Sequence, residues 1–464
     1  MSATPKVEEA IMARRILLRL LLSIVALCLL APTAAEAGTR YRGVQLHSLW
    51  AAGSNSDMVR ELDLASRAGA NVVRVDVGWS SLESGGKGQI SAWYLQKLDR
   101  FVNAADVRGM KVIATLWSTP CWASTAPATK KQGCEGAWWD RGVTVYAPED
   151  PADYADVARL VTTRYGTKLA ALEVWNEPNL AGGRFWIAED EPLEYTVLLR
   201  AAYRAAKAGN PNVPVLAGAL AYTNPLFLAG MYEAGAMGSY DGLSVHPYQG
   251  ARSLARGWSG MTWIRGIKAA AGDRTPIWVT EFGWSTCNSG HGACVSERRQ
   301  GEYTAASFAA LDEMDDVEAA VAYNLRAKGT DAGSFESNFG LVRRNYAPKP
   351  AYEALRRALG GRGRRSTGHR AGDGRGRGST GHRVRLRLRR QRRGVVAYVR
   401  GPRRTQVRLR VSGCHRARSR SLWVRTNRRG RGLRRLGYTS RLSGCRVRAS
   451  VPGGGAVATR LRMR

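Results

Sequence analysis

Between residues 41 and 360, short apolar runs alternate with segments whose apolar residues recur at helical spacing. The runs are apolar at consecutive positions, which is typical of strands that are buried on both faces of a parallel sheet. Eight of them are found: RGVQLH (42–47), NVVRVDVGW (71–79), KVIATLW (111–117), LEVWNE (172–177), PVLAGAL (214–220), GLSVHPY (242–248), PIWVTEFGW (276–284) and EAAVAYNLR (318–326).

The segments between these runs complete a strand–helix repeat. Helix-like stretches cover residues 56–69, 92–109, 154–166, 193–209 and 297–314. Eight strands that alternate with helices over residues 41–360 predict an α/β fold, a (β/α)8 barrel (TIM barrel) with loop insertions. A doubly wound open sheet is the alternative, but no glycine-rich phosphate-binding loop follows the first strand.

The amino-terminal segment has the pattern of a signal peptide. Arg14 and Arg15 precede an apolar run over 16–31, and AEA (35–37) is a small-x-small cleavage site. The run is shorter than the roughly 20 residues that a membrane span needs; an uncleaved anchor is the alternative. We predict that residues 1–37 are removed, that no membrane span remains after cleavage, and that the protein is secreted or held at the cell surface.

Cysteine usage agrees with export. One of the seven cysteines, Cys28, lies in the apolar run. The other six form three pairs of neighbours in the chain, and short loops cost the least entropy to close. Six cysteines allow 15 connectivities, and a zinc site is not indicated because no CxxC motif is present. The predicted disulfides are Cys121–Cys134, Cys287–Cys294 and Cys414–Cys445.

The net charge of +34 is concentrated in the last part of the chain. Residues 361–464 hold 33 of the 71 basic residues, all of them arginine, and one of the 37 acidic residues. The first 360 residues, with 38 basic and 36 acidic side chains, are therefore nearly neutral. A neutral domain over residues 38–360 is thus followed by a very basic region.

The basic region divides into a linker and a small domain. Residues 361–383 are rich in Gly, Arg and Ser and contain STGHR twice, a composition typical of flexible linkers. From residue 384 to residue 464, apolar residues and arginines alternate as in half-buried strands, and this pattern predicts a small β-sandwich. The predicted strands are 384–390, 394–401, 406–413 and 445–451.

Polar side chains stand near the carboxyl ends of the predicted barrel strands, where such barrels place their reacting groups. Two carboxylates at one barrel mouth suit glycosidic cleavage, which needs one carboxyl to protonate the leaving oxygen and another to meet the oxocarbenium-like centre. The residues are Arg74 in the second strand, Trp117 in the third, Glu177 in the fourth, His246 and Tyr248 in the sixth, Glu281 in the seventh and Tyr323 in the eighth.

Three of these strand ends carry specific motifs: WNEPN (175–179), HPY (246–248) and TEFGW (280–284). With ATLWSTPCWA (114–123) and NFGLVRRNYAPKPAYEAL (338–355), they make residues 41–360 resemble the retaining glycoside hydrolases of clan A, nearest to families 5 and 39. The resemblance implies a carbohydrate substrate and double displacement by two glutamates. No cofactor or metal motif appears, and this chemistry requires neither.

The resemblance also implies roles for single residues. Glu177 would be the acid/base and Glu281 the nucleophile. The supporting residues would be Asn176 on the sugar 2-hydroxyl, Tyr248 and Arg74 on the nucleophile, and His246 beside the neighbouring subsite. Trp117, Trp284 and Tyr323 are predicted to contact substrate, with Tyr323 where many relatives have a tryptophan.

Three functions remain open on this basis. The favoured one is a secreted retaining glycosidase that acts on a β-linked poly- or oligosaccharide. The second is a catalytically silent glycan-binding protein on the same barrel, and the third is an arginine-driven binding protein. For the basic region we favour acidic polymers of the cell envelope or extracellular matrix over nucleic acid; the alternative is that its arginines are only solvated.

Overall fold

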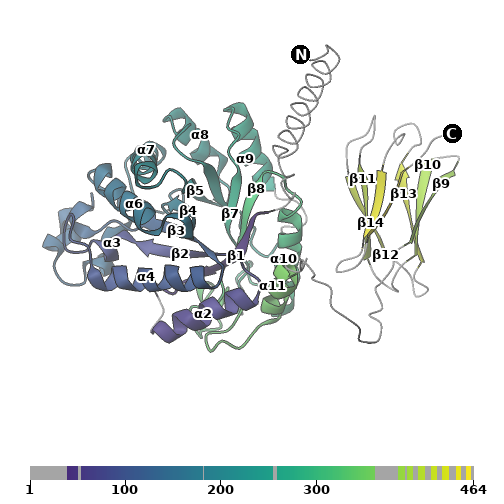
Figure 1. The fold of residues 1–464 in the computed structure, drawn as a ribbon, viewed down its shortest axis with the longest axis horizontal. Helices are drawn as coiled ribbons and strands as arrows, with labels where there is room; N and C mark the ends of the chain where they lie inside the picture. Colours follow the sequence, from purple (N-terminus) through teal and green to yellow (C-terminus); the bar gives the residue numbers. More distant parts are fainter. Residues whose placement is uncertain are drawn as a thin grey trace, which may run out of the picture. The chain divides into compact units, whose positions relative to one another are not determined.

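The computed structural model describes residues 39–50, 54–180, 182–253 and 259–360, together with seven strands between residues 385 and 460 (Figure 1). The predicted signal peptide (1–37) and linker (361–383) lie outside the described residues. The chain divides into two compact units, Met1–Arg364 and Arg365–Arg464. Each unit is described by itself below.

Eight strands of the first unit, all of them parallel, form a closed barrel in chain order. This confirms the predicted (β/α)8 barrel. The strands are β1 (Tyr41–Leu46), β2 (Val72–Gly78), β3 (Lys111–Trp117), β4 (Leu169–Val174), β5 (Val215–Ala221), β6 (Gly242–His246), β7 (Ile277–Phe282) and β8 (Val317–Ala322).

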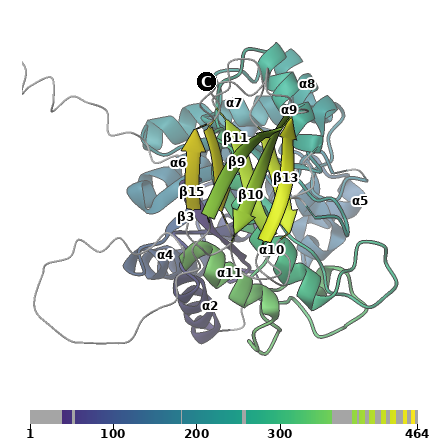
Figure 2. The same cartoon turned by 90° about the vertical axis from the view of Figure 1, so that its right-hand side faces the viewer.

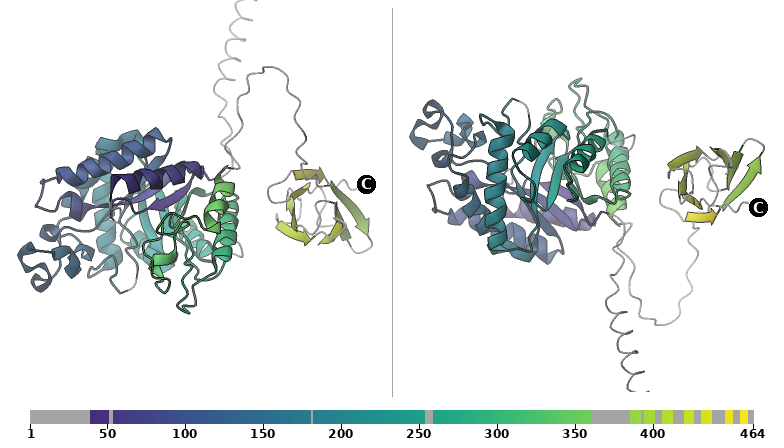
Figure 3. Two further views of the ribbon diagram at one scale, coloured as in Figure 1. Left: turned by 90° about the horizontal axis from the view of Figure 1, so that it is seen from below. Right: turned by 90° about the horizontal axis from the view of Figure 1, so that it is seen from above.

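Helices surround the strands as an outer layer, as two views at right angles to Figure 1 show (Figure 3). Each strand is followed by at least one helix, so the chain returns to the same end of the barrel before every strand. The principal helices are α2 (Asn55–Arg67), α4 (Ala92–Val107), α6 (Pro151–Tyr165), α7 (Glu191–Gly209), α8 (Pro225–Glu233), α9 (Ser259–Ala270), α10 (Glu297–Leu311) and α11 (Pro350–Gly360).

Side-chain caps begin several of these helices. The Asp150 carboxylate accepts from Ala152 N at the start of α6, and the Asp190 carboxylate accepts from Leu193 N at the start of α7. Both helices also have a proline in the first turn, where no intrahelical N–H bond is lost. These local signals set where each helix starts after the long loops that precede it.

The barrel interior changes from apolar to charged along the strand direction. Because side chains alternate along a strand, β2 points Val72, Arg74 and Asp76 inward in turn. Gln45 and Glu173 reach the level of Arg74 from β1 and β4. The interior where the strands begin is apolar and consists of Val72, Ile113, Ala170, Ala171, Leu216, Trp278, Ala319 and Val321.

The pairing of β7 with β8 is irregular at a position that matters for the site. The register shifts between Val279 and Phe282, and strict alternation is lost there. As a result Thr280 and Glu281, which are neighbours in sequence, both contact groups inside the barrel mouth.

Two of the three predicted disulfides are confirmed. Cys121 and Cys134 are bonded with a Cα–Cα distance of 5.6 Å, and Cys287 and Cys294 with one of 5.3 Å. The predicted pair Cys414–Cys445 lies outside the described residues. Among the helices that the structure describes, none combines the length and the apolar composition that crossing a bilayer requires.

The second unit contains two antiparallel sheets (Figure 2). Strands β9, β10, β11 and β14 correspond to the four predicted strands, whereas β12, β13 and β15 were not predicted. The sheet orders are β13-β10-β9 and β12-β11-β14-β15, in which the strands are β9 (Arg385–Gln391), β10 (Gly394–Arg400), β11 (Gln406–Ser412), β12 (Arg420–Arg425), β13 (Arg431–Gly437), β14 (Arg446–Ser450) and β15 (Ala456–Arg460). The sandwich itself stays a prediction.

Candidate active site

Arg74 connects the buried middle of the barrel with its mouth. The side chain is fully buried, and its Nε donates to Glu173 Oε2 at 2.7 Å. Nη1 donates to Gln45 Oε1 at 3.0 Å and to Glu281 Oε1 at 2.5 Å, and Nη2 donates to Asn176 Oδ1 at 2.9 Å. A guanidinium has a fixed fork of donors, so these bonds orient at once four partners from three segments: β1, β4 with the turn that follows it, and β7.

Glu281 accepts a hydrogen bond on each carboxylate oxygen. Arg74 donates to Oε1, and the Tyr248 hydroxyl donates to Oε2 at 2.7 Å. Burial, followed by the charge of Glu281, raises the pKa of Tyr248 well above its usual value. Tyr248 therefore stays a neutral donor to the carboxylate at any ordinary pH.

A chain of hydrogen bonds links Glu173 to Glu177. The Ser244 hydroxyl donates to Glu173 Oε1 at 2.5 Å and lies 2.5 Å from the Thr280 hydroxyl. Since Ser244 gives its one proton to Glu173, Thr280 donates to Ser244 and can only accept from His246 Nε2, 3.1 Å away. Nε2 is therefore protonated, and Nδ1, 2.8 Å from Glu177 Oε1, shares a single proton with that carboxyl.

The pKa shifts of Glu173 and His246 agree with that proton count. Burial raises the pKa of Glu173, but Arg74 and then His246 lower it more, and the net pKa is below its usual value. Burial lowers the pKa of His246, but Glu281 and the hydrogen bond to Glu177 raise it above its usual value. Glu173 is thus an acceptor only, and His246 readily holds the shared proton.

The turn after β4 places the second carboxyl. Trp175 and Glu177 have left-handed backbones, with φ values of 70° and 46°, which cost roughly 1 kcal/mol or more each for residues other than glycine. Trp175 is fully buried and its Nε1 donates to Phe185 O at 2.8 Å. Asn179 binds the backbone N and O of Ala221 at 2.8 and 3.0 Å. These contacts hold the strained turn in place.

The two glutamates meet at the mouth of the barrel. One carboxylate oxygen of Glu177, one of Glu281 and one ring nitrogen of His246 all lie within 4.8 Å of one another. The two glutamates are 9% and 7% exposed, respectively. Within the described part of the chain, this trio is also the group that could hold a metal ion. Arg74 already supplies a positive charge to Glu281, and the prediction of a metal-free site stays a prediction.

Tyr323 lies beside this centre, and Trp117 ends β3 at the same end of the barrel. Trp117 is half-buried, its ring is 5.4 Å from that of Phe185, and its Nε1 has no hydrogen-bond partner among the described residues. Tyr323 follows β8 directly, and its ring centroid is 6.3 Å from that of Tyr248. Both positions are compatible with the predicted contact to substrate.

Trp284 lies elsewhere. Its side chain is 2% exposed and belongs to the hydrophobic core. The ring packs against Phe282 and against Tyr303 of α10, and its Nε1 donates to Arg252 O at 3.0 Å. The predicted contact of Trp284 with substrate does not agree with this burial: three residues beyond Glu281, the chain has turned from the mouth into the core.

Several residues of the site were not found by sequence reasoning. Thr115 donates to Glu173 Oε2 at 2.7 Å, and Gln45 Nε2 donates to Asp76 Oδ2 at 3.2 Å. Each is a polar residue with an apolar residue on either side of it in its strand, as is Ser244. That isolation within a strand is the signal by which they could have been recognised.

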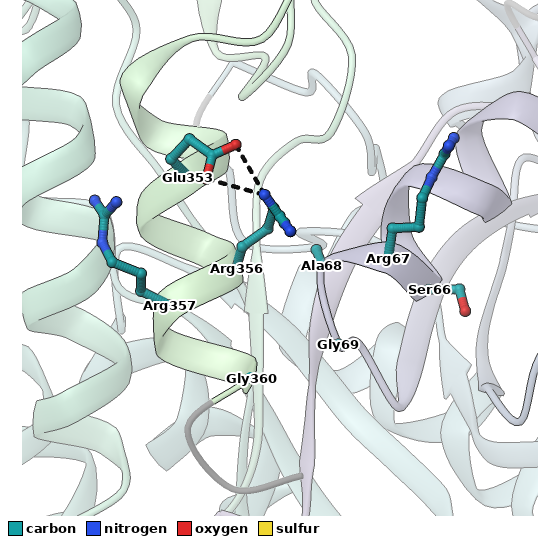
Figure 4. Close-up of a pocket in the computed structure, with 8 residues that line it drawn as sticks. All are labelled: Ser66, Arg67, Ala68, Gly69, Glu353, Arg356, Arg357 and Gly360. Atoms are coloured by element: carbon teal, nitrogen blue, oxygen red, sulfur yellow. Dashed lines mark hydrogen bonds and ion pairs between the residues drawn. The ribbon is translucent and has the colours of Figure 1, made fainter. Parts of the chain in front are cut away.

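A hollow of about 340 Å³ lies far from these groups, between the ends of α2 and α11 (Figure 4). Gly69, which precedes β2, forms part of its wall, so the hollow is at the end of the barrel where the strands begin. Among its lining residues, Arg356 is paired with Glu353 at 3.1 Å. Barrels of this type place reacting groups at the opposite end, and this hollow is not a candidate active site.

Comparison with known proteins agrees with this geometry. The family model described as Cellulase (glycosyl hydrolase family 5) matches residues 33–323. Among curated proteins, none matches the chain.

Solved structures share the fold at low sequence identity. A family 39 glycoside hydrolase from Bacteroides cellulosilyticus WH2 has a TM-score of 0.56 and 18% identity, over 86% of this chain and 81% of that one. GH5_18 from Streptomyces cattleya, in complex with GlcNAc, gives 0.53 and 18%, over 70% and 80%. A monomeric β-xylosidase from Caulobacter crescentus CB15 gives 0.52 and 18%, over 81% and 83%.

Proposed function

This chain belongs to glycosyl hydrolase family 5 and is a glycosidase, and we propose that it cleaves β-linked poly- or oligosaccharides with retention of configuration. The observation that carries the proposal is that one carboxylate oxygen of Glu177 and one of Glu281 lie within 4.8 Å of each other at one barrel mouth. Retaining enzymes hold their two carboxyl groups about 5–5.5 Å apart, whereas inverting enzymes leave room for a water molecule. The short separation supports retention.

In the first step, a Glu281 oxygen attacks the anomeric carbon while the bond to the leaving oxygen breaks. Glu177 gives the proton that it shares with His246 Nδ1 to that oxygen, so the leaving sugar departs neutral and His246 keeps its proton on Nε2. Arg74 and Tyr248 hold Glu281 by one oxygen each, which aims the carboxylate and stabilises its charge before attack. The product of this step is a glycosyl ester of Glu281.

In the second step, the Glu177 carboxylate takes a proton from water, and the water oxygen attacks the anomeric carbon. The ester bond to Glu281 breaks, and its carboxylate returns to Arg74 and Tyr248. His246 stands beside Glu177 with a protonated Nε2 and a shared proton at Nδ1. This arrangement supports a carboxyl that must both give and regain a proton in one cycle.

Asn176 is positioned to bind the reacting sugar. Arg74 carries only donors, so the amide oxygen of Asn176 faces it, at 2.9 Å. The amide NH2 is thereby left as a donor toward the mouth, and we assign it to the sugar 2-hydroxyl. A hydrogen bond to that hydroxyl strengthens at the transition state.

The test is to identify a substrate and then the anomer of its first product. A panel of aryl β-glycosides and β-linked polysaccharides should reveal cleavage, and NMR spectra recorded in the first minutes should show the β-anomer before mutarotation. Initial release of the α-anomer would contradict the mechanism. A protein that binds glycans from the panel but cleaves none of them would instead be a catalytically silent binding protein.

We further propose that the protein is exported. The amino-terminal pattern and the two described disulfides support this, because disulfides persist in oxidising compartments. Mass spectrometry of protein from the culture medium or cell surface should find a mature chain that begins at Gly38. Recovery of the full-length chain from inside the cell would contradict export.

For the basic unit we propose binding to an acidic polymer. Arg410 stands opposite Arg448 in the pairing of β11 with β14, and Arg446 stands opposite Arg460 in that of β14 with β15. Residues 361–464 hold 33 arginines and one acidic residue, and such an excess of positive charge attracts polyanions. Binding to an acidic polysaccharide should weaken steeply as salt rises; binding that ignores salt would contradict the proposal, and preference for DNA would favour nucleic acid.

A further inference from the structure

A hollow of about 490 Å³ adjoins the proposed active site. Its lining includes Tyr222, Tyr248, Gly260 and Trp263. Tyr248 belongs to both places, since its hydroxyl donates to Glu281 at 2.7 Å. The backbone N of Tyr222 donates to the carbonyl oxygen of His246 at 3.0 Å. The hollow and the proposed active site therefore share Tyr248 as a wall residue.

Two of the lining rings are unusually exposed. Tyr222 is 63% exposed and Trp263 is 66% exposed. Large aromatic faces left in water beside a cavity are a mark of a binding surface. The C–H faces of a pyranose ring are apolar and match such aromatic faces, while the sugar hydroxyls remain in contact with water.

The backbone holds both rings at the hollow. Tyr222 and the following Thr223 each have a φ of 54°, a strained conformation that clusters at ligand sites. At Gly260 a Cβ would lie only 1.7 Å from Thr223 Oγ1, so glycine permits α9 to approach this turn. Trp263, three residues further along α9, lies on the same face of the helix as Gly260.

We propose that this hollow is a sugar-binding subsite, in which Trp263 and Tyr222 hold a second ring of the substrate next to the ring that reacts. The inference rests on the proposed function and deepens it. It assigns the recognition of chain length to α8 and α9, outside the group of residues that touch the reacting carbon. The ligand class is a pyranose within a β-linked oligosaccharide.

The test compares two substrates that differ in how many subsites they fill. A β-glycosyl fluoride has a one-atom leaving group and fills only the reacting position, whereas the tetrasaccharide of the same sugar, with the β-linkage that the substrate panel identifies, fills its neighbours. The ratio of kcat/KM for the tetrasaccharide to that for the fluoride should fall about tenfold in Trp263→Ala, the loss of one aromatic stacking contact. Trp263→Phe, which keeps an aromatic face, should recover part of that ratio.

Trp93→Ala is the matched control, because Trp93 is 69% exposed on α4 and does not line the hollow. It should leave the activity on both substrates unchanged. An unchanged ratio in Trp263→Ala, or an equal loss on both substrates, would overturn the subsite. A wild-type protein that cleaves neither the fluoride nor the tetrasaccharide would instead count against the proposed function itself.

Discussion

Glu173 and Glu177 lie four residues apart at the end of β4, yet they stand in two different regions of the barrel. Glu173 belongs to a buried layer, is 0% exposed, and is bonded to Arg74, Thr115 and Ser244. Glu177 belongs to the mouth, is 9% exposed and bonds to His246 through one oxygen. The same side chain is thus a structural anion in one place and, in the proposed mechanism, a proton carrier in the other.

The difference follows from hydrogen-bond saturation. A buried carboxylate with a charged partner and several hydrogen-bond donors is stable as an anion, and it does not readily take up a proton. A carboxyl at the mouth that keeps one oxygen for a ligand can change its protonation state during a reaction. Variants of the mouth should therefore change activity, and variants of the buried layer should change stability.

The largest effect is expected for Glu281→Ala. Without a nucleophile the glycosyl ester cannot form, and kcat on an activated aryl β-glycoside should fall by more than about 10⁴-fold. Steady-state kinetics measures this, with thermal unfolding as the control for folding. Retention of more than a hundredth of the parent activity, in protein free of contaminating glycosidase, would mean that Glu281 is not the nucleophile.

Glu177→Gln should follow, with a loss of about 10²–10⁴-fold on oligosaccharides. On substrates whose leaving group needs no proton, such as dinitrophenyl glycosides, the activity should fall much less, because the acid assists only poor leaving groups. The measurement is kcat/KM across aryl glycosides whose leaving groups differ in pKa. Equal losses across that series would contradict the role of acid.

Arg74→Met tests the buried layer. Its removal leaves Glu173 buried without a charged partner, and the free energy of unfolding should fall by about 3–5 kcal/mol. Arg298→Met is the matched control, because the Arg298–Glu302 pair is exposed and such pairs contribute about 1 kcal/mol or less. Denaturant unfolding of both variants measures the two losses of stability. Similar losses would mean that the buried layer around Arg74 stabilises the fold no more than an exposed ion pair does.

Tyr248→Phe should have a smaller effect on activity. It deletes one hydrogen bond to a charged group, a contribution of about 1.5–3 kcal/mol, so kcat should fall roughly 10–100-fold. Phenylalanine keeps the ring that lines both the mouth and the neighbouring hollow, and KM for oligosaccharides should change little. A KM effect without a kcat effect would reassign Tyr248 to substrate binding alone.

The smallest effect is expected on the pH dependence of stability. Although burial lowers the pKa of His246, Glu281 and Glu177 raise it above the usual value of 6.5. A raised folded pKa stabilises the fold below pH 6.5, and this contribution is lost as pH rises through the folded pKa. Relative to His246→Asn, the wild-type free energy of unfolding should decline over that interval; a rise would reverse the assigned direction.

Much of the fold and of the candidate site could be predicted from local sequence patterns. The eight runs of consecutive apolar residues predicted the barrel, because a strand that is buried on both faces has apolar residues at consecutive positions. The three strand-end motifs pointed to Glu177, His246 and Glu281 because the carboxyl ends of parallel strands meet at one end of a barrel. The disulfides between near neighbours followed from short loops that are cheap to close.

The sequence alone does not show which residue, far away along the chain, each side chain contacts in the folded protein. Trp284 was expected at the substrate and lies in the core, since the chain turns inward just after the irregular end of β7. Nothing in the sequence connects Thr280 and Ser244 with His246, yet their hydroxyls decide which nitrogen of His246 holds a proton. Such properties arise from distances between strands far apart in sequence, and these distances exist only once the barrel has closed.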